Sequence, residues 1–439
     1  MPPVARSHPS EPPVSLAIMG RGWRLLRATD GGAEVPSSAI VARHRCRLPQ
    51  TRPAATATAT AALTWIDDMT ARGLVVAGYV GYEIGAALEG LPLGGRMDAA
   101  PDAGDGRPRY GTTSRGSAGL SRPPDAALVA FEPDCWRPLP PTAPISGRCH
   151  APAASPPADL VRQRASYLAL VKTALAAIGE GRYYQLNLSV GFETAAPAEL
   201  GTGPLAHVLG RLLQPQPVPF AMAMQFDDWR YFSLSMERFL GVTPAPSGTA
   251  LVRSRPIKGT TRRDADTRED AANRRALCQS AKERAENTMI VDMVRNDLAR
   301  VATLGSVCVP TLLEAVGYRT LWHLESEVHA TLPASVRASD LLRATLPPAS
   351  VTGCPKIAAM RAISALEGRR RGPYCGAVGV WLPDGTVDLS VGIRGVLQRG
   401  LRARFDVGAG IVADSDPEAE WRETCLKADA ALRGVAGLG

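Results

Sequence analysis

The sequence has few of the features that mark membrane or secreted proteins. No apolar run approaches the roughly 20 residues that cross a bilayer, and the run at residues 14–19 is too short for the core of a signal peptide. The eight cysteines are widely spaced and include no C-x-x-C pair. That pattern favours free thiols in a reducing compartment over disulfides. We therefore expect a soluble, cytoplasmic protein.

Aromatic residues are also scarce, at 5% of the chain. The 50 basic and 42 acidic residues give a net charge of +8 that is spread along the sequence rather than gathered in a stripe. A nucleic-acid-binding protein would more often concentrate its basic residues near aromatics. Neither a G-x-G-x-x-G nor a Walker A loop is present. The composition therefore favours a small anionic substrate over nucleic acid.

Proline, glycine and polar residues divide the chain unevenly. Residues 1–13 are predicted to be a disordered tail, and residues 14–158 an N-terminal region with loops over 91–126 and 137–158. Strand-like runs occupy 74–85 and 126–136. From residue 159 to residue 439 the pattern becomes regular, and this part is predicted to carry the chemistry. The length, 439 residues, allows two domains or one large interleaved unit.

Hydrophobic periodicity predicts the elements of this second part. Helices are predicted over residues 159–179, 282–301, 339–343, 355–367 and 417–433. Strands are predicted over 182–194, as a hairpin within 220–242, and over 374–381, 386–397 and 401–412. Because adjacent strands outnumber strand–helix–strand units, the sequence predicts an α+β fold.

Two predicted helices carry carboxylates at i and i+3. Glu283 and Glu286 lie near the start of one helix, and Glu420 and Glu423 lie in the last helix. Two such pairs could converge on Mg²⁺, which takes one or two carboxylates directly and keeps several waters. Acidic residues that complement helix dipoles are the alternative.

Other residues are suggestive only in combination. Lys258 in the predicted turn PIKGT could be a nucleophile or a surface lysine. Glu237, after a strand, could be a buried general acid or the partner of a neighbouring arginine. His323 could serve the reaction or the core. Arg394, in an apolar strand, needs an anionic partner from the protein or a ligand.

One more candidate is a glycine-rich turn, Gly408-Ala409-Gly410, before the last helix. Its backbone N–H groups could receive a carboxylate, although a simple turn explains the glycines as well.

Nine segments in a fixed order carry a family resemblance over residues 160–436: YYQLNLS, SMERF, PIKGT, KERAENTMIVDMVRNDLARV, HLESEV, SVTGCPKIAAMRAI, RRGPYCGAVG, IRG and GAGIVADSDPEAEWRETCLKA. Together they resemble the chorismate-binding enzymes. The resemblance implies an α/β sandwich of two packed antiparallel sheets with outer helices, Mg²⁺ as cofactor and chorismate as substrate.

The resemblance also implies roles for single residues. Glu286 and Glu423 resemble Mg²⁺ ligands, Glu283 and Glu420 the residues that hold the metal's waters, and Glu237 the acid for the leaving hydroxyl. Positions that match the substrate pocket are Gln185, His323, Thr352, Tyr374, Arg394, Gly408, Gly410 and Lys427. Met236 and Cys354 replace the usual proline and alanine, and we expect activity to survive both changes.

Two residues separate the members of the family. Isochorismate and salicylate synthases carry a water-activating lysine where this chain has Gln185, and anthranilate synthases read PIAGT where it has Lys258. PIKGT resembles aminodeoxychorismate synthases, in which the lysine attacks C2 of chorismate. That activity would take ammonia from a separate glutamine amidotransferase. An anthranilate synthase subunit and a non-catalytic chorismate-binding paralogue are the alternatives.

Overall fold

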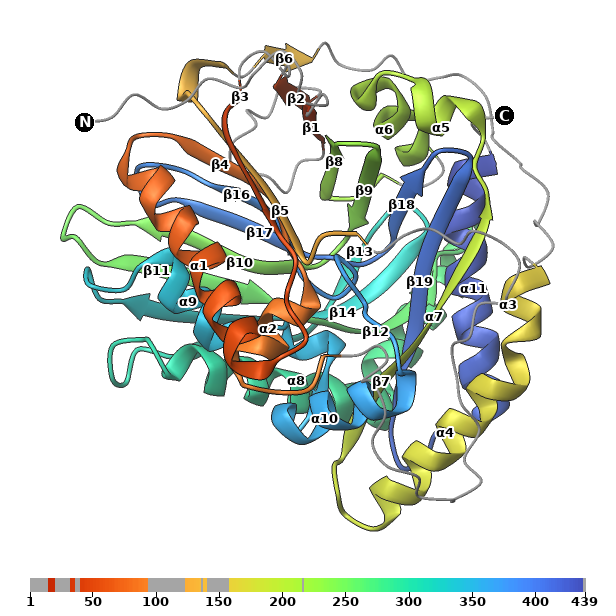
Figure 1. The fold of residues 1–439 in the computed structure, drawn as a ribbon. Helices are drawn as coiled ribbons and strands as arrows, with labels where there is room; N and C mark the ends of the chain where they lie inside the picture. The colour runs from red at the N-terminus through yellow and green to blue at the C-terminus, as the bar shows by residue number, and fades with distance from the viewer. Residues whose placement is uncertain are drawn as a thin grey trace.

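Two antiparallel sheets form the centre of the molecule in the computed structural model (Figure 1). The structure describes residues 15–19, 32–35, 40–93, 123–135, 137–139, 158–214 and 217–436. The predicted tail over 1–13 lies outside these residues, as do most of the loops predicted over 91–126 and 137–158.

Sheet A has nine strands among the described residues. In spatial order they are β15 (Gly353–Cys354), β7 (Gln185–Ala195), β19 (Arg402–Ile411), β18 (Gly395–Arg399), β9 (Trp229–Ser235), β8 (Phe220–Phe226), β1 (Ser15–Met19), β2 (Gly32–Val35) and β6 (Arg137–Leu139).

Sheet B runs in the order β12 (Ile257–Arg262), β14 (Leu321–Leu332), β11 (Ala250–Arg255), β10 (Arg238–Pro244), β17 (Val387–Val391), β16 (Ala377–Trp381), β4 (Val75–Val80), β5 (Ala126–Phe131) and β3 (Ile40–Cys46). A further strand, β13 (Cys308–Gly317), pairs with β14 beside this path. The predicted fold class, an α+β sandwich of two antiparallel sheets, is confirmed.

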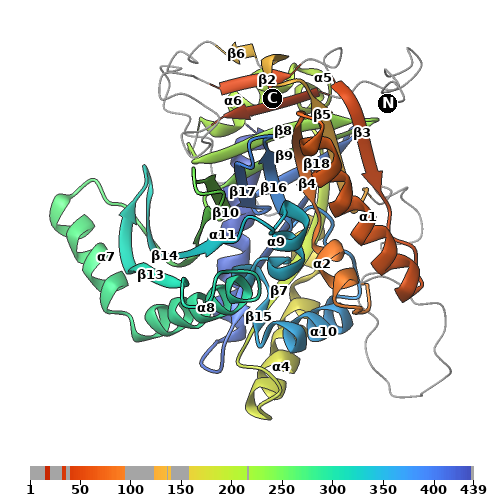
Figure 2. The same ribbon diagram turned by 90° about the vertical axis from the view of Figure 1, so that its left-hand side faces the viewer.

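Helices cover the outer faces of both sheets (Figures 1 and 2). They are α1 (Arg52–Ala71), α2 (Tyr82–Leu88), α3 (Ala158–Arg162), α4 (Arg164–Gly179), α5 (Ala198–Thr202), α6 (Leu205–Leu213), α7 (Thr267–Gln279), α8 (Ala281–Ala299), α9 (Ala338–Thr345), α10 (Lys356–Glu367) and α11 (Pro417–Ala436), with single 3₁₀ turns η2 (Pro133–Cys135) and η3 (Ala349–Val351). Helices α4 and α11 pack together on β7 and β19, and α8 packs on β12 and β14. Among the described helices, none combines the length and the apolar character needed to span a membrane.

The core between the sheets explains why several strands have continuous apolar sequences. In β4, Val75, Ala77 and Tyr79 point into a cluster shared with β8 and β9 of sheet A. Val76 and Val80, on the other face, join the cluster beneath the helices. A strand that is buried on both faces shows no polar alternation, so its sequence alone does not reveal its neighbours.

Strands from before residue 159 pair within both sheets. Strand β1 pairs with β8, so that Leu16 lies opposite Met224, and β4 pairs with β16, so that Gly78 lies opposite Gly379. The N-terminal region therefore shares its two sheets with the rest of the chain.

Two predicted strands are wrong in their extent. The strand predicted over 74–85 ends at Val80, and the turn at Gly81 leads into α2. The strand predicted over 386–397 is two strands, because the chain leaves sheet B after Val391 and enters sheet A at Gly395. Arg394, with a left-handed φ of 53°, lies at this crossing.

Two glycines with positive φ test how tightly the sheet is packed. A Cβ on Gly78 (φ 144°) would lie 2.1 Å from the carbonyl oxygen of Ala127, whereas a Cβ on Gly73 (φ 83°) would meet nothing within 4 Å. G73A should therefore cost only the backbone strain, about 1 kcal/mol. G78A should cost at least about 3 kcal/mol, since β4 and β5 must separate. Urea unfolding measures both, and equal losses would contradict this packing.

Candidate active site

Lys258, on edge strand β12 of sheet B, reaches Gly410, on β19 of sheet A. A Cβ placed on Gly410 would lie 3.1 Å from Lys258 Nζ, 2.9 Å from Gln185 Nε2 and 3.8 Å from Glu286 Oε2. Three predicted functional side chains, distant in sequence, therefore meet at a fourth predicted residue, Gly410. Glycine at position 410 leaves the room that their polar ends occupy.

Lys258 was predicted to lie in a turn, and this is wrong. It is the second residue of β12, whose register against β14 shifts between Ile257 and Thr260. Gly259, at a φ of 89°, provides the irregularity, and a Cβ there would lie 3.0 Å from Glu283 Oε2. The glycine thus brings the strand against the first turn of α8.

The predicted glycine turn is also wrong. Gly408 and Gly410 lie within β19, opposite Ser189 and Asn187 of β7. A Cβ on Gly408 would lie 2.1 Å from the carbonyl oxygen of Leu188. Glycine at 408 is therefore required by close strand packing, and glycine at 410 by the side chains that meet there, rather than by a loop of free N–H groups.

Four carboxylates from two helices line the same region. Ser280 caps α8 by accepting a hydrogen bond from the Glu283 backbone N–H at 3.3 Å, and Glu283 and Glu286 follow in its first two turns. Burial, and then repulsion within the acidic group, raises the pKa of Glu283, Glu286 and Glu420. The Lys282 ammonium lies 3.9 Å from Glu286 Oε1 and 3.7 Å from Glu420 Oε1.

Glu423 differs from the other three. Burial alone would raise its pKa, but the Lys427 ammonium, 2.7 Å from Glu423 Oε1, holds the pKa below its ordinary value. Lys427 Nζ also donates to the Gly408 carbonyl oxygen at 2.9 Å. Lys427 therefore links α11 to β19, the strand that carries Gly408 and Gly410 and forms the floor of the site.

This donor set fits a hard divalent cation. Crowded, partly buried carboxylates with raised pKa values gain from a nearby positive charge, and oxygen is the ligand that Mg²⁺ prefers. Within the described part of the chain, no three His, Cys, Asp or Glu side chains converge closely enough to hold a metal by themselves. Such a set suits an ion that keeps several of its waters.

Glu237 occupies the short connection between β9 and β10. Burial raises its pKa to about 7, while Ser350 and Lys258 act in the opposite direction. The neighbouring Arg238 contacts the carboxylate of Asp388. A carboxyl that stays protonated near neutral pH can give its proton to a leaving group.

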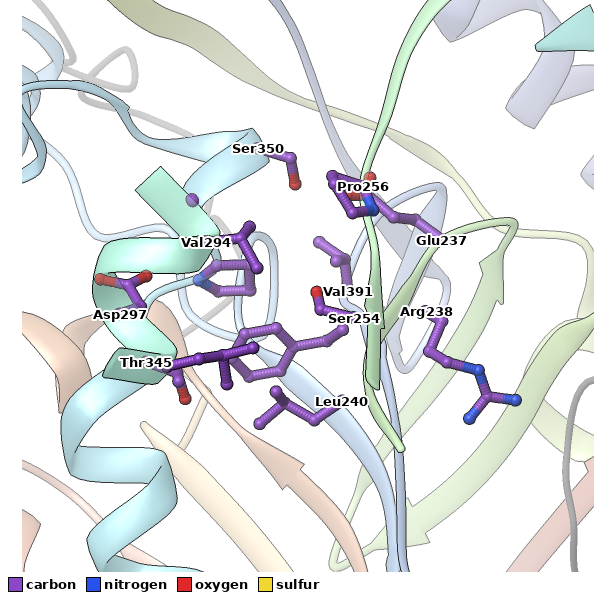
Figure 3. A pocket seen from close by; sticks show the side chains of 14 residues that line it. Glu237, Arg238, Leu240, Ser254, Pro256, Val294, Asp297, Thr345, Ser350 and Val391 are labelled. Carbon is purple, nitrogen blue, oxygen red and sulfur yellow. The ribbon is translucent and has the colours of Figure 1, made fainter. Parts of the chain in front are cut away.

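A small pocket adjoins Glu237, lined on its other sides by α8 and the loop before α10 (Figure 3). Figure 3 shows the Ser350 hydroxyl directed towards the middle of this pocket. Ser350 was not among the residues predicted for the site, although it lies in the segment SVTGCPK two residues before Thr352. Lys282 was not among them either, because a lysine beside two glutamates has an ordinary explanation on a helix.

His323 is buried on β14, and its Nδ1 lies 2.8 Å from Thr260 Oγ1. Burial, with help from Arg394, lowers the pKa of His323 to about 3. The imidazole is therefore neutral at physiological pH. Met236, which replaces the usual proline, places its sulfur 3.2 Å from His323 Nε2.

The remaining predicted pocket residues come from three segments: Arg394 from the crossing between the sheets, Thr352 from the loop before α10, and Tyr374 from the turn before β16. Burial lowers the pKa of Arg394, and no carboxylate among the described residues pairs with it. An arginine in that setting suits an anionic ligand. Thr352 is buried and its hydroxyl donates to the Ala349 carbonyl oxygen at 3.0 Å. Tyr374 is buried as well, and burial raises its pKa.

Comparison with known proteins gives the geometry a context. A family model described as chorismate binding enzyme matches residues 25–433. Aminodeoxychorismate synthase component 1 of Salmonella typhimurium is 40% identical over 252 residues, 57% of this chain and 53% of that protein. Anthranilate synthase component 1 of Aquifex aeolicus is 35% identical over 266 residues, 61% of this chain and 52% of that protein. The chain thus spans about half the length of these relatives.

Among solved structures, a putative 2,3-dihydroxybenzoate-specific isochorismate synthase from Bacillus anthracis has a TM-score of 0.67. It is 19% identical, and the match covers 97% of each chain. At that identity the similarity supports a shared fold and nothing further.

The raised pKa of Glu237 predicts a pH-dependent stability. The protonated form is favoured in the folded state, so the folded protein binds more protons than the unfolded chain between the ordinary pKa of 4.5 and the raised pKa of about 7. Stability from this group is full below the lower value and is lost as pH rises through the upper one.

E237Q removes this titration. Its free energy of unfolding, relative to the unmodified protein, should rise by up to about 3 kcal/mol between pH 4.5 and pH 8. Urea unfolding at both pH values measures the difference. A difference that does not change with pH would mean that Glu237 titrates normally.

Proposed function

This chain belongs to the family of chorismate-binding enzymes, and on that premise we propose that it is an aminodeoxychorismate synthase subunit. It would convert chorismate and ammonia to 4-amino-4-deoxychorismate, the precursor of 4-aminobenzoate. The observation that supports this most is the position of Lys258, whose Nζ reaches the floor of the site at Gly410.

The surroundings of Lys258 suit a nucleophile rather than a surface lysine. Burial raises the pKa of Glu237, Glu283 and Glu286, and the charge of Lys258 opposes that rise, so Lys258 lies within electrostatic reach of both the acid and the carboxylate cluster. Gln185, with its Nε2 near the same point, is an amide and cannot activate water as a base. These surroundings support an amine as the group that attacks the substrate.

In the first proposed step, the neutral amine of Lys258 forms a C–N bond at C2 of chorismate. Both ring double bonds shift, C1=C2 to C1=C6 and C5=C6 to C4=C5, and the bond between C4 and its hydroxyl oxygen breaks. Glu237 gives its proton to that oxygen, which leaves as water. Lys258 is then a secondary ammonium that is bonded to the ring, and Glu237 is a carboxylate.

In the second step, ammonia forms a C–N bond at C4, both double bonds shift back, and the bond from C2 to Lys258 breaks. Lys258 returns as the free amine. The new ammonium on C4 passes one proton to Glu237, which restores the acid. The sum is chorismate plus ammonia giving aminodeoxychorismate plus water.

The remaining residues would bind and orient the substrate. Glu286 and Glu423 would hold Mg²⁺, with Glu283 and Glu420 on its waters, and the bound ion supplies positive charge to a chorismate carboxylate. Arg394 would pair with a carboxylate, because no described residue neutralises it. Neutral His323, Thr352 and Tyr374 would complete the pocket.

Ammonia would come from a separate glutamine amidotransferase. This chain shows no glutaminase-like cysteine motif, and the name of the Salmonella relative, component 1, speaks of a further component in that organism. The seven described cysteines are unpaired, which suits a reducing compartment, and we assign the reaction to the cytoplasm.

An anthranilate synthase subunit is the second candidate, favoured by the 35% identity to the Aquifex protein. The two activities give different products from the same substrates. Anthranilate synthesis releases pyruvate and an aromatic amine, whereas aminodeoxychorismate keeps the enolpyruvyl group.

Product identity is the first prediction from this proposal. The purified chain, incubated with chorismate, ammonium and Mg²⁺, should form aminodeoxychorismate by mass spectrometry, without pyruvate. A parallel sample with a chelator in place of Mg²⁺ should form none. Anthranilate with pyruvate would favour the second candidate, and chorismate binding without turnover would favour a non-catalytic paralogue.

The role of Lys258 gives a second prediction. K258A should lower kcat by at least about a hundredfold, which corresponds to about 2.7 kcal/mol in the barrier. K172A is the matched control, since Lys172 is an exposed residue of α4, and its kcat should not change. Equal rates for K258A and the unmodified enzyme would rule out covalent catalysis.

A further inference from the structure

The turn that carries Tyr374 is packed directly on the backbone of the N-terminal region. The Tyr82 N–H donates to the Gly372 carbonyl oxygen at 2.9 Å. A Cβ on Gly81 would lie 2.7 Å from that same oxygen, and one on Gly376 would lie 2.3 Å from the Val80 carbonyl oxygen. The turn at Gly81 and the turn that carries Tyr374 are therefore in direct backbone contact.

Glu83 fixes this contact from inside the protein. It is 2% exposed, and its two carboxylate oxygens accept hydrogen bonds from the backbone N–H groups of Arg371, at 2.6 Å, and Gly372, at 2.9 Å. A carboxylate that accepts two adjacent N–H groups sets the direction in which the chain leaves the turn. Tyr374 follows two residues later.

The guanidinium of Arg371 extends the connection to two further walls of the site. Nη1 donates to the Val351 carbonyl oxygen at 2.9 Å, next to Thr352, and Nη2 donates to the Asn187 carbonyl oxygen at 2.6 Å. Asn187 lies opposite Gly410 on β7, two residues beyond Gln185.

The charge of Arg371 is compensated locally. Its Nε and Nη2 donate to the two carboxylate oxygens of Glu367, at 3.1 and 2.7 Å, and its guanidinium lies 4.7 Å above the ring of Tyr82. Four of its five N–H groups are thus donated to protein acceptors, and the residue is only 2% exposed, so it is held away from substrate. Its function must be exerted through the backbone that it holds.

We propose that Glu83 and Arg371 are positioning residues, through which the N-terminal region holds three walls of the chorismate pocket in register. The walls are the loop with Thr352, the turn with Tyr374, and the end of β7 with Gln185. This inference rests on the proposed function only for the identity of the ligand. It gives the N-terminal region a part in substrate binding through the backbone that Glu83 holds.

E83Q tests the proposal with little change in shape. One amide oxygen still accepts an N–H, but the amide nitrogen opposes the second N–H, donor against donor. The matched control is D67N. Asp67 also lies in the N-terminal region, and it accepts the backbone N–H of Ser339 at 3.1 Å, at the start of α9 and away from the Arg371 turn.

The measurement is the dissociation constant for chorismate by calorimetry at pH 8 with Mg²⁺, together with Tm. Burial, and then Asp125, raises the pKa of Glu83 to about 7, so this pH keeps the carboxylate ionised. E83Q should bind chorismate about tenfold more weakly, the usual order for lost support behind a binding group. D67N should lower Tm while leaving chorismate binding unchanged.

A second variant changes the same contact in a different way, so that the conclusion does not depend on E83Q alone. G81A adds a methyl group 2.7 Å from the Gly372 carbonyl oxygen, which displaces the turn but keeps Glu83 and Arg371. It should weaken chorismate binding as E83Q does. Unchanged binding in both variants, or equal weakening in D67N, would overturn the proposal.

Binding and turnover separate this proposal from the previous one. If the unmodified protein binds chorismate without aminating it, the proposed function fails while the comparison of dissociation constants still decides the role of Glu83.

Discussion

The site depends on one contact between the two sheets, in which Lys258 of edge strand β12 reaches over Gly410 of β19. Any side chain at position 410 would occupy the space of the lysine amine and the Gln185 amide. Glycine at 259 lets β12 approach α8 and its first glutamates in the same way. Glycines at positions 259 and 410 thus allow a lysine, an amide and the carboxylate cluster to meet in one place. The other residues of the site lie around that point.

Burial then gives the ionisable groups different tasks. Glu237 has a pKa of about 7 and can carry a proton. His323 is buried too, but burial lowers the pKa of a base, so its ring is neutral. Among the four helix carboxylates, Glu423 alone has its pKa held low, by Lys427. An acid, a neutral hydrogen-bonding ring and an anionic carboxylate can therefore coexist within one site.

Much of the second part of the chain could be predicted from its sequence, because its helices are amphipathic and its motifs are local. The helix predicted over 282–301 and the pairing of β8 with β9 depend on such local signals. Gly408 and Gly410 could not be assigned to a strand, since glycine is needed at 408 because of the β7 backbone and at 410 because of side chains from distant parts of the chain.

Pairing between strands that are distant in sequence is the main feature that could not be predicted. The break at Arg394 sends one apolar run into two different sheets, and both halves are buried, so no change of polarity marks it. Likewise the pairing of β4 with β16 joins segments some three hundred residues apart in the chain. The positioning role proposed for Glu83 and Arg371 depends on that pairing, and the sequence alone contains no sign of it. Apolar periodicity identifies a buried strand but not its neighbour.

The most direct measurement of the central claim is the intact mass of the protein after exposure to chorismate and Mg²⁺ without ammonia. The account predicts a population that is heavier by one chorismate less one water, with the added group on Lys258 after digestion. Addition of ammonium should discharge it. An unchanged mass, or an adduct on another residue, would contradict the assignment of Lys258 as the nucleophile.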